Sequence, residues 1–250
     1  FTASAGEAAE LLITGLGFYE VYMNGARITK GFLAPYISAP SDLVYYDRYD
    51  ISPYLRDGEN VLGVWLGNGL QNNPGGYVWD FDRAPWVAAP CLGCRLTVGE
   101  AMIESDDAFL TAPSPLLMDD YRWGEVYDAN LEIPGWNEPG FDESAWRPAS
   151  PCPRPTGLIR PCDCEPIKAV REIQPISVTR EPEGWRYDFG VNTSGVCRVE
   201  IHGKKGQRIE LRHSELLTGG LFDDGNLNFH RSDLDENVQR IVYICRGGAK

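Results

Sequence analysis

The chain contains 250 residues, and its 23 Lys and Arg side chains against 36 Asp and Glu side chains give a formal net charge of −13. An apolar share of 43% and a charged share of 24% are ordinary for a globular protein, so the composition argues against disorder. The acidic balance also argues against nucleic acid and anionic membrane surfaces as partners, because both attract clustered Lys and Arg.

A β-hairpin is predicted near the N-terminus, over residues 17–28. Apolar and polar side chains alternate there, so Tyr19, Val21 and Met23 should share one face of a strand. The Asn-Gly pair at 24–25 is typical of a type I′ turn, in which both central residues need positive φ.

A single helical turn is predicted within residues 50–60. Ser52 is expected to be its N-cap, Pro53 its first helical residue and Gly58 its stop. Further strands, bounded by turn residues, are predicted at 60–67 and 91–98.

The loop at residues 67–86 combines aromatic rings, amides and few charges. Aromatic faces stack on the C–H surfaces of sugars, while amides and carboxylates bond their hydroxyl groups. The alternative is that Trp65 and Trp86 belong to the core and that the Asn and Gly residues only make turns. The candidate carbohydrate-binding residues are Asn68, Asn72, Asn73, Tyr77, Trp79, Trp86, Glu125 and Asp128.

The seven cysteines do not indicate a disulfide framework in a chain of this size. Cys91 and Cys94 have the spacing that starts many zinc sites, but they lie in an apolar strand and no His-rich partner follows. Buried or linker thiols in a reducing compartment are the favoured interpretation, which favours the cytoplasm. A secreted protein stays an alternative, because the chain begins at Phe1 and any upstream targeting segment is invisible.

The sequence contains no motif that points to a catalytic group. His213 is followed directly by Ser214 and Glu215, and neighbouring strand residues point to opposite faces, so these three should not form a triad.

The second half of the chain begins with a proline-rich connector. Five prolines within residues 151–166 predict an extended segment, because proline disfavours both helices and central strands. A second hairpin, turning at 204–207, is expected to pair residues 199–201 with residues 209–211. Strands are predicted at 168–181, 185–190, 194–203 and 239–248.

These patterns predict an all-β fold of two β-sandwich modules in tandem, since no amphipathic helix of ten residues occurs in the sequence. Residues 1–150 hold 8 basic and 22 acidic side chains, whereas residues 151–250 hold 15 basic and 14 acidic ones. The asymmetry supports a first β-sandwich at 1–150, a connector at 151–166 and a second β-sandwich at 167–250.

Several motifs carry a resemblance to a known family. The stretches GLGFYEVYMNGARI (15–28), YDISPYLRDGENVLGVWLGNG (49–69) and GEVYDANLEIPGWNEPGFDESAW (124–146) resemble the N-terminal modules of the bacterial α-L-rhamnosidases of glycoside hydrolase family 78. The stretch YDFGVNTSGVCRVEIHGKKGQRIELRHSELL (187–217) resembles the β-sandwich that follows in that family. The motifs stand in the family's order over residues 11–247.

This resemblance implies a jelly-roll or galactose-binding-like module followed by a concanavalin-like module. In the family, hydrolysis of terminal α-L-rhamnosyl bonds is carried out by a later (α/α)₆ barrel, so no catalytic residue is expected in this chain. The family often has Arg where this chain has Asn130. Its second sandwich also continues beyond Gly248, which implies that the sandwich at 167–250 is truncated here. We therefore expect an open edge at 239–245, through which the chain self-associates or which a neighbour covers.

Some relatives bind L-rhamnose through a calcium ion in an N-terminal module. Calcium takes carboxylate and carbonyl oxygens, and its free positions accept sugar hydroxyls. The relatives' own ligands do not map onto this sequence, and the carboxylates that are candidate calcium ligands here are Asp80, Asp82, Glu125 and Asp128.

Three functions therefore compete. The chain is an accessory region that packs against its own missing catalytic barrel, a stand-alone module that binds L-rhamnose or a related glycan, or an interaction protein that pairs through an open sheet edge. Exposure of Tyr77, Trp79 and Trp86 would favour the second function, and an exposed apolar edge at 239–245 the third.

Overall fold

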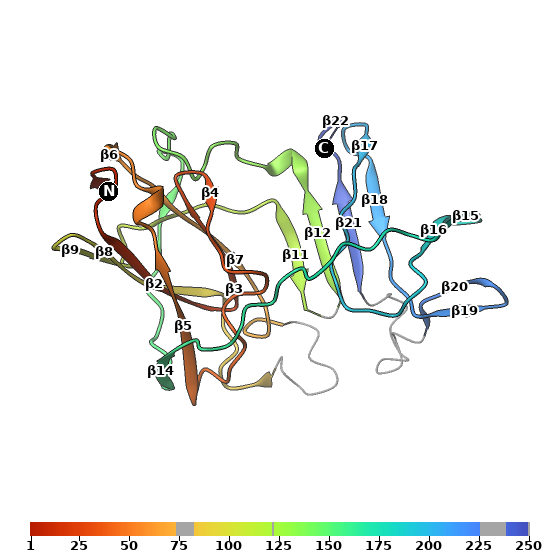
Figure 1. Cartoon of the computed structure of the whole chain (residues 1–250), viewed down its shortest axis with the longest axis horizontal. Helices are drawn as coiled ribbons and strands as arrows, with labels where there is room; N and C mark the ends of the chain where they lie inside the picture. The colour runs from red at the N-terminus through yellow and green to blue at the C-terminus, as the bar shows by residue number, and fades with distance from the viewer. Residues whose placement is uncertain (74–82, 122, 226–238, 250) are drawn as a thin grey trace. The chain divides into compact units, whose positions relative to one another are not determined.

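The computed structural model describes residues 1–73, 83–121, 123–225 and 239–249 (Figure 1). They are almost entirely strands, turns and loops, which confirms the predicted all-β fold. None of the helices in these ranges has the length and apolarity needed to cross a membrane. Contacts divide the chain into two compact units. The first comprises the described residues of Phe1–Gly76, Asp80–Ser114 and Glu132–Ile167, and the second those of Pro115–Leu131 and Lys168–Lys250.

The first unit contains a five-stranded and a three-stranded sheet. The larger sheet has the order β14 (Leu158–Pro161), β5 (Leu43–Asp50), β2 (Ala9–Leu16), β8 (Cys91–Val98) and β9 (Ala101–Glu104). The smaller has the order β4 (Ala26–Arg27), β3 (Phe18–Met23) and β7 (Leu62–Gly67). Two short pairs complete it, β1 (Thr2–Ala3) with β6 (Gly58–Glu59) and β10 (Leu110–Thr111) with β13 (Arg147–Pro148).

The core of the first unit combines alternate side chains from both sheets. Leu11 and Ile13 of β2, in the larger sheet, are at most 1% exposed. Tyr19, Val21 and Met23 of β3, in the smaller sheet, are at most 2% exposed, as their alternation predicted. Apolar faces of two sheets that share one core make a β-sandwich.

The turn between β3 and β4 is as predicted. Met23 pairs with Ala26 across it, and both central residues have positive φ, 51° at Asn24 and 83° at Gly25. This is the backbone that a type I′ turn requires.

The predicted helical turn forms as the 3₁₀ helix η1 (Ser52–Tyr54), but its N-cap is Ile51 and not Ser52. The hydroxyl of Ser52 instead donates to the Asp50 carboxylate at 2.6 Å and accepts from the Ala9 backbone N–H at 2.9 Å. These bonds tie the turn to β2, so a tertiary contact replaces the local cap. The turn also ends at Tyr54, well before the expected stop at Gly58.

The proline-rich connector is extended, as predicted, and part of it joins a sheet. β14 pairs in parallel with β5 at the outer edge of the five-stranded sheet. An edge strand tolerates Pro161 because one of its sides makes no ladder hydrogen bonds.

The second unit is built around a four-stranded sheet in the order β11 (Leu116–Asp120), β12 (Gly124–Asp128), β21 (Arg240–Ile244) and β18 (Arg208–Leu211). Figure 1 shows the green strand β12 beside β21 from the far end of the chain. The two run parallel, and Tyr127 stacks on its register partner Tyr243 with ring centroids 5.6 Å apart. After β12 comes the 3₁₀ turn η3 (Ala129–Leu131). Three short pairs lie outside this sheet: β15 (Ser177–Glu181) with β16 (Gly184–Asp188), β17 (His202–Gly203) with β22 (Gly248–Ala249), and β19 (Leu216–Thr218) with β20 (Leu221–Asp223).

Two predictions for this unit are wrong. The hairpin between residues 199–201 and 209–211 does not form, because residues 194–201 are in no strand and the strand predicted at 194–203 is reduced to β17. β18 pairs instead with β21, which places Ile241 and Tyr243 opposite Leu211 and Ile209. The second is the open edge at 239–245, because β21 lies between β12 and β18 and is paired on both sides.

The division into 1–150, 151–166 and 167–250 stays a prediction. The compact units differ from it in two respects. Residues 115–131, which include the β21 partner β12, group with the second unit, and residues 151–167 group with the first.

Candidate functional site

The loop that carries most candidate sugar contacts is held by its own amides. It follows β7 because Gly67 and Asn68 end the strand. The side chain of Gln71 donates to the backbone carbonyl of Trp86 at 2.7 Å, and that of Asn72 donates to the Asn68 side-chain oxygen at 3.0 Å. The first bond joins the two described ends of the loop and fixes where the Trp86 backbone lies, and the second ties Asn72 to the residue that follows β7.

The candidates in this loop differ in their access to solvent. Asn73 is only 1% exposed, so its side chain belongs to the interior of the first unit. Asn68, Asn72 and Trp86 are partly exposed. Tyr77 and Trp79 lie outside the described residues, so their exposure stays a prediction. Of the loop candidates that the structure describes, only Asn68, Asn72 and Trp86 reach the surface.

Glu125 and Asp128 lie in the second unit, on β12. Glu125 is opposite Asp119 of β11. Burial raises the pKa of Glu125, and the negative charge of Asp119 raises it further.

Asp128 is engaged by the residues that follow it. Its carboxylate accepts hydrogen bonds from the Asn130 side chain at 2.7 Å and from the Asn130 backbone N–H at 2.9 Å. Both bonds hold the pKa of Asp128 below its usual range. Asn130 also donates to the Cys245 carbonyl at 3.2 Å. Asn130, which stands where the family often has Arg, therefore links the ends of β12 and β21.

The predicted calcium ligands do not assemble within the described residues. Glu125 and Asp128 are three positions apart on one strand, so their side chains point to opposite faces of the sheet. Asp80 and Asp82 lie outside the described residues. In the described part of the chain, no group of three or more His, Cys, Asp or Glu is arranged to hold a metal ion.

Cys91 and Cys94 both lie on β8, the strand that was predicted at 91–98. No described group of three or more possible ligands includes them, so the described residues assemble no zinc site there. The thiols of both cysteines are free, and burial raises the pKa of each to about 11. A protonated thiol is a poor metal ligand.

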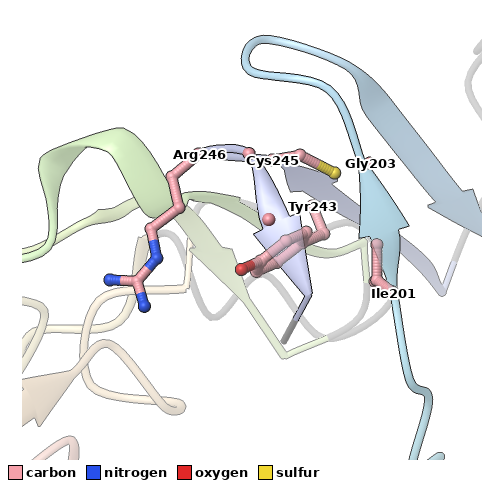
Figure 2. Close-up of a pocket in the computed structure, with 7 residues that line it drawn as sticks. Ile201, Gly203, Tyr243, Cys245 and Arg246 are labelled. Atoms are coloured by element: carbon pink, nitrogen blue, oxygen red, sulfur yellow. The ribbon is translucent and has the colours of Figure 1, made fainter.

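The second unit has a small pocket beside β21 (Figure 2), but it cannot hold a sugar. Its volume is about 10 Å³, which is room for about one water molecule. Figure 2 shows the Cys245 sulfur directed toward Gly203, while the Arg246 side chain extends away. The lining residues are Ile201, Gly203, Tyr243, Cys245, Arg246, Gly247 and Gly248.

An apolar surface that the sequence analysis overlooked lies on the β15–β16 hairpin. Val178 is opposite Tyr187 in the register, and side chains two residues apart share a face, so one face carries an apolar row. Arg180 lies at the turn end of the same face, opposite Trp185, with its guanidinium carbon 5.4 Å from the centroid of that ring. Trp185 is 61% exposed and Ile176 is 73% exposed. We name this row, which consists of Ile176, Val178, Trp185, Tyr187 and Phe189, the apolar hairpin face.

The signal for this face was present in the sequence. Apolar residues alternate at positions 176 and 178 and again at 185, 187 and 189. The alternation correctly indicates two strands, but it does not tell whether their apolar face is covered. The opposite face is polar, and there Arg186 donates to Glu181 at 2.6 Å.

Comparison with known proteins gives a family match over most of the chain. The α-L-rhamnosidase N-terminal domain matches residues 5–171, and the bacterial α-L-rhamnosidase concanavalin-like domain matches residues 179–250. An α-L-rhamnosidase of Formosa agariphila is 32% identical over 96% of this chain and 26% of its own length. One of Streptomyces avermitilis is 31% identical over 84% of this chain and 21% of its own length.

Solved structures agree with these matches. The α-L-rhamnosidase from Dictyoglumus thermophilum covers the whole chain with a TM-score of 0.86 and 33% identity, and the chain covers 28% of it. The Streptomyces avermitilis α-L-rhamnosidase complexed with L-rhamnose covers the whole chain with a TM-score of 0.86 and 28% identity, and the chain covers 24% of it. The chain thus spans about a quarter of the length of the relatives it matches.

Proposed function

Because the chain belongs to the α-L-rhamnosidase N-terminal domain family, followed by the concanavalin-like domain of the same enzymes, we propose that it is a non-catalytic accessory region of an α-L-rhamnosidase. Its role is to pack against the remainder of the enzyme and to frame the cleft in which a terminal α-L-rhamnosyl bond is hydrolysed.

The observation that carries this proposal is the apolar hairpin face. Exposed apolar surface that extends over several large side chains marks a surface that another protein segment covers. The relatives supply the identity of that segment, because this chain corresponds to only 26% and 21% of their length. The occupant that we propose is the remainder of the same enzyme.

An activity assay tests this proposal. The purified 250-residue chain is incubated with 4-nitrophenyl α-L-rhamnopyranoside, with the Streptomyces avermitilis enzyme as positive control. No release of nitrophenol above the buffer rate is expected. If nitrophenol-releasing activity co-purifies with this chain in a second purification, the chain contains a catalytic site and the proposal is wrong.

A second candidate function is carbohydrate binding by the first unit. It is favoured by the partly exposed Trp86 ring, which lies in the same loop as the partly exposed amides of Asn68 and Asn72. An aromatic ring and amides supply the stacking surface and the hydrogen-bonding groups that a sugar needs.

Calorimetry with L-rhamnose, with and without calcium, tests this second function. We expect weak binding that Trp86→Ala removes, with Trp185→Ala of the second unit as the matched control. An absence of heat across millimolar sugar in both conditions would leave the accessory role alone.

A further inference from the structure

One cysteine and one histidine of the second unit form a hydrogen-bonded pair at the surface. The sulfur of Cys197 lies 3.4 Å from Nε2 of His213. Nδ1 of His213 lies 3.1 Å from the backbone carbonyl oxygen of Gln239. A carbonyl can only accept a hydrogen bond, so Nδ1 carries the proton and the neutral ring presents an unprotonated Nε2 to the thiol.

The sheet explains why the histidine is held in this orientation. β18 and β21 are antiparallel, and Leu211 pairs with Ile241, so the continuing register brings His213 opposite Gln239. The backbone of the sheet end therefore fixes the ring. A base oriented by a third group and within reach of a thiol is the arrangement that activates a cysteine as a nucleophile.

Cys197 differs in its accessibility from four of the other six cysteines, since Cys152 and Cys164 are exposed as well. Burial raises the pKa of Cys91 and Cys94 to about 11, and it also raises that of Cys162. Cys245 is 3% exposed. These four thiols are shielded from reagents or kept protonated, whereas Cys197 is exposed.

We propose that Cys197 is a thiol-modification site, which His213 activates for mixed-disulfide formation with a low-molecular-weight disulfide of the glutathione class. Nε2 of His213 takes the thiol proton, and the Cys197 thiolate attacks one sulfur of the disulfide. A bond forms between Cys197 and that sulfur while the reagent's own S–S bond breaks. The departing thiolate takes up a proton and leaves as one equivalent of free thiol, so the exchange needs no other oxidant.

The experiment measures how fast each cysteine of the intact chain reacts. The protein is exposed at neutral pH to oxidised glutathione, and separately to iodoacetamide, and modification of each peptide is followed by mass spectrometry. Cys164, which is also exposed, is the internal reference. We expect Cys197 to react about tenfold faster than Cys164 with both reagents.

Two variants assign the effect to His213. His213→Gln keeps a polar side chain beside the sulfur but removes the base, and it should bring Cys197 within about twofold of Cys164. His202→Gln is the matched control, because His202 contacts Glu200 at 3.1 Å, and it should leave the rate unchanged. Equal rates of Cys197 and Cys164 in the unaltered protein, or an unchanged Cys197 rate in His213→Gln, would overturn the proposal.

Discussion

At the scale of single residues, the buried amide of Asn60 holds the first unit together at the end of η1. It is 1% exposed, and all its polar atoms are bonded. Its oxygen accepts from the Arg56 N–H and the Asn24 side chain, and its nitrogen donates to the carbonyls of Arg56 and Gly58. A buried carbonyl that loses its donor costs about 1–3 kcal/mol.

We therefore predict that Asn60→Asp lowers the free energy of unfolding by about 2 kcal/mol or more, because it removes both donors without changing the shape of the side chain. Urea denaturation measures the change. Asn192→Asp, at an exposed asparagine, is the control for the added charge. Equal effects of the two substitutions would refute the importance of these bonds.

Glu125 allows a prediction of pH dependence. Its folded-state pKa is raised, so the folded protein binds this proton more tightly than the unfolded chain does. The stability that this carboxyl contributes is complete below its unfolded pKa of about 4.3 and is lost as the pH rises through the folded value. Glu125→Gln should therefore be more stable than the unaltered protein at pH 7.

The expected gain is less than about 1 kcal/mol, because the side chain is partly solvated and water screens the repulsion. It should vanish near pH 4, where the glutamate is protonated. Urea denaturation at both pH values measures it, with Glu143→Gln as control for net charge. A gain of the same size at pH 4 would contradict the explanation.

At the scale of elements, the packing of β17 against the end of β21 depends on a glycine. A Cβ on Gly203 would lie 2.4 Å from the sulfur of Cys245, far inside contact distance. Gly203→Ala should therefore destabilise the second unit by about 1–3 kcal/mol.

A double-mutant cycle checks this contact by thermal unfolding. In a Cys245→Ala background the sulfur is absent, and Gly203→Ala should cost much less. Gly184→Ala, where a Cβ meets nothing within 4 Å, is the control for glycine replacement in a strand. The same loss in both backgrounds would show that the sulfur contact is unimportant.

The apolar hairpin face leads to a prediction of unchanged stability. Tyr187 is 57% exposed, so replacing it removes little packing within this chain. Tyr187→Ser should leave the melting temperature within about 2 °C of the original while it lowers binding of a hydrophobic dye. Val242→Ala, in the core at 1% exposure, is the contrasting variant and should lower the melting temperature. A large loss of stability in Tyr187→Ser would mean that the face is covered within this chain.

At the scale of the whole molecule, the sequence predicted the elements whose partners are local. The β3–β4 hairpin follows from the turn chemistry of Asn24-Gly25, and the burial of Val21 follows from strand alternation. It did not predict the pairing of β12 with β21, because those strands lie more than 100 residues apart and short-range patterns carry no information on such partners.

The candidate site shows the same limit. Composition drew attention to the loop after β7, but it could not separate the buried Asn73 from the partly exposed Asn72 beside it. The Cys197–His213 pair was also out of reach, because its geometry depends on the register of β18 against β21.

The central claim, that the chain is an accessory part of a larger α-L-rhamnosidase, is tested most directly by sequencing the transcript downstream of the codon for Lys250. The account predicts an open reading frame that continues through the rest of a concanavalin-like domain into a long helical segment, because the relatives are about four times as long as this chain. A stop codon directly after Lys250 would contradict it.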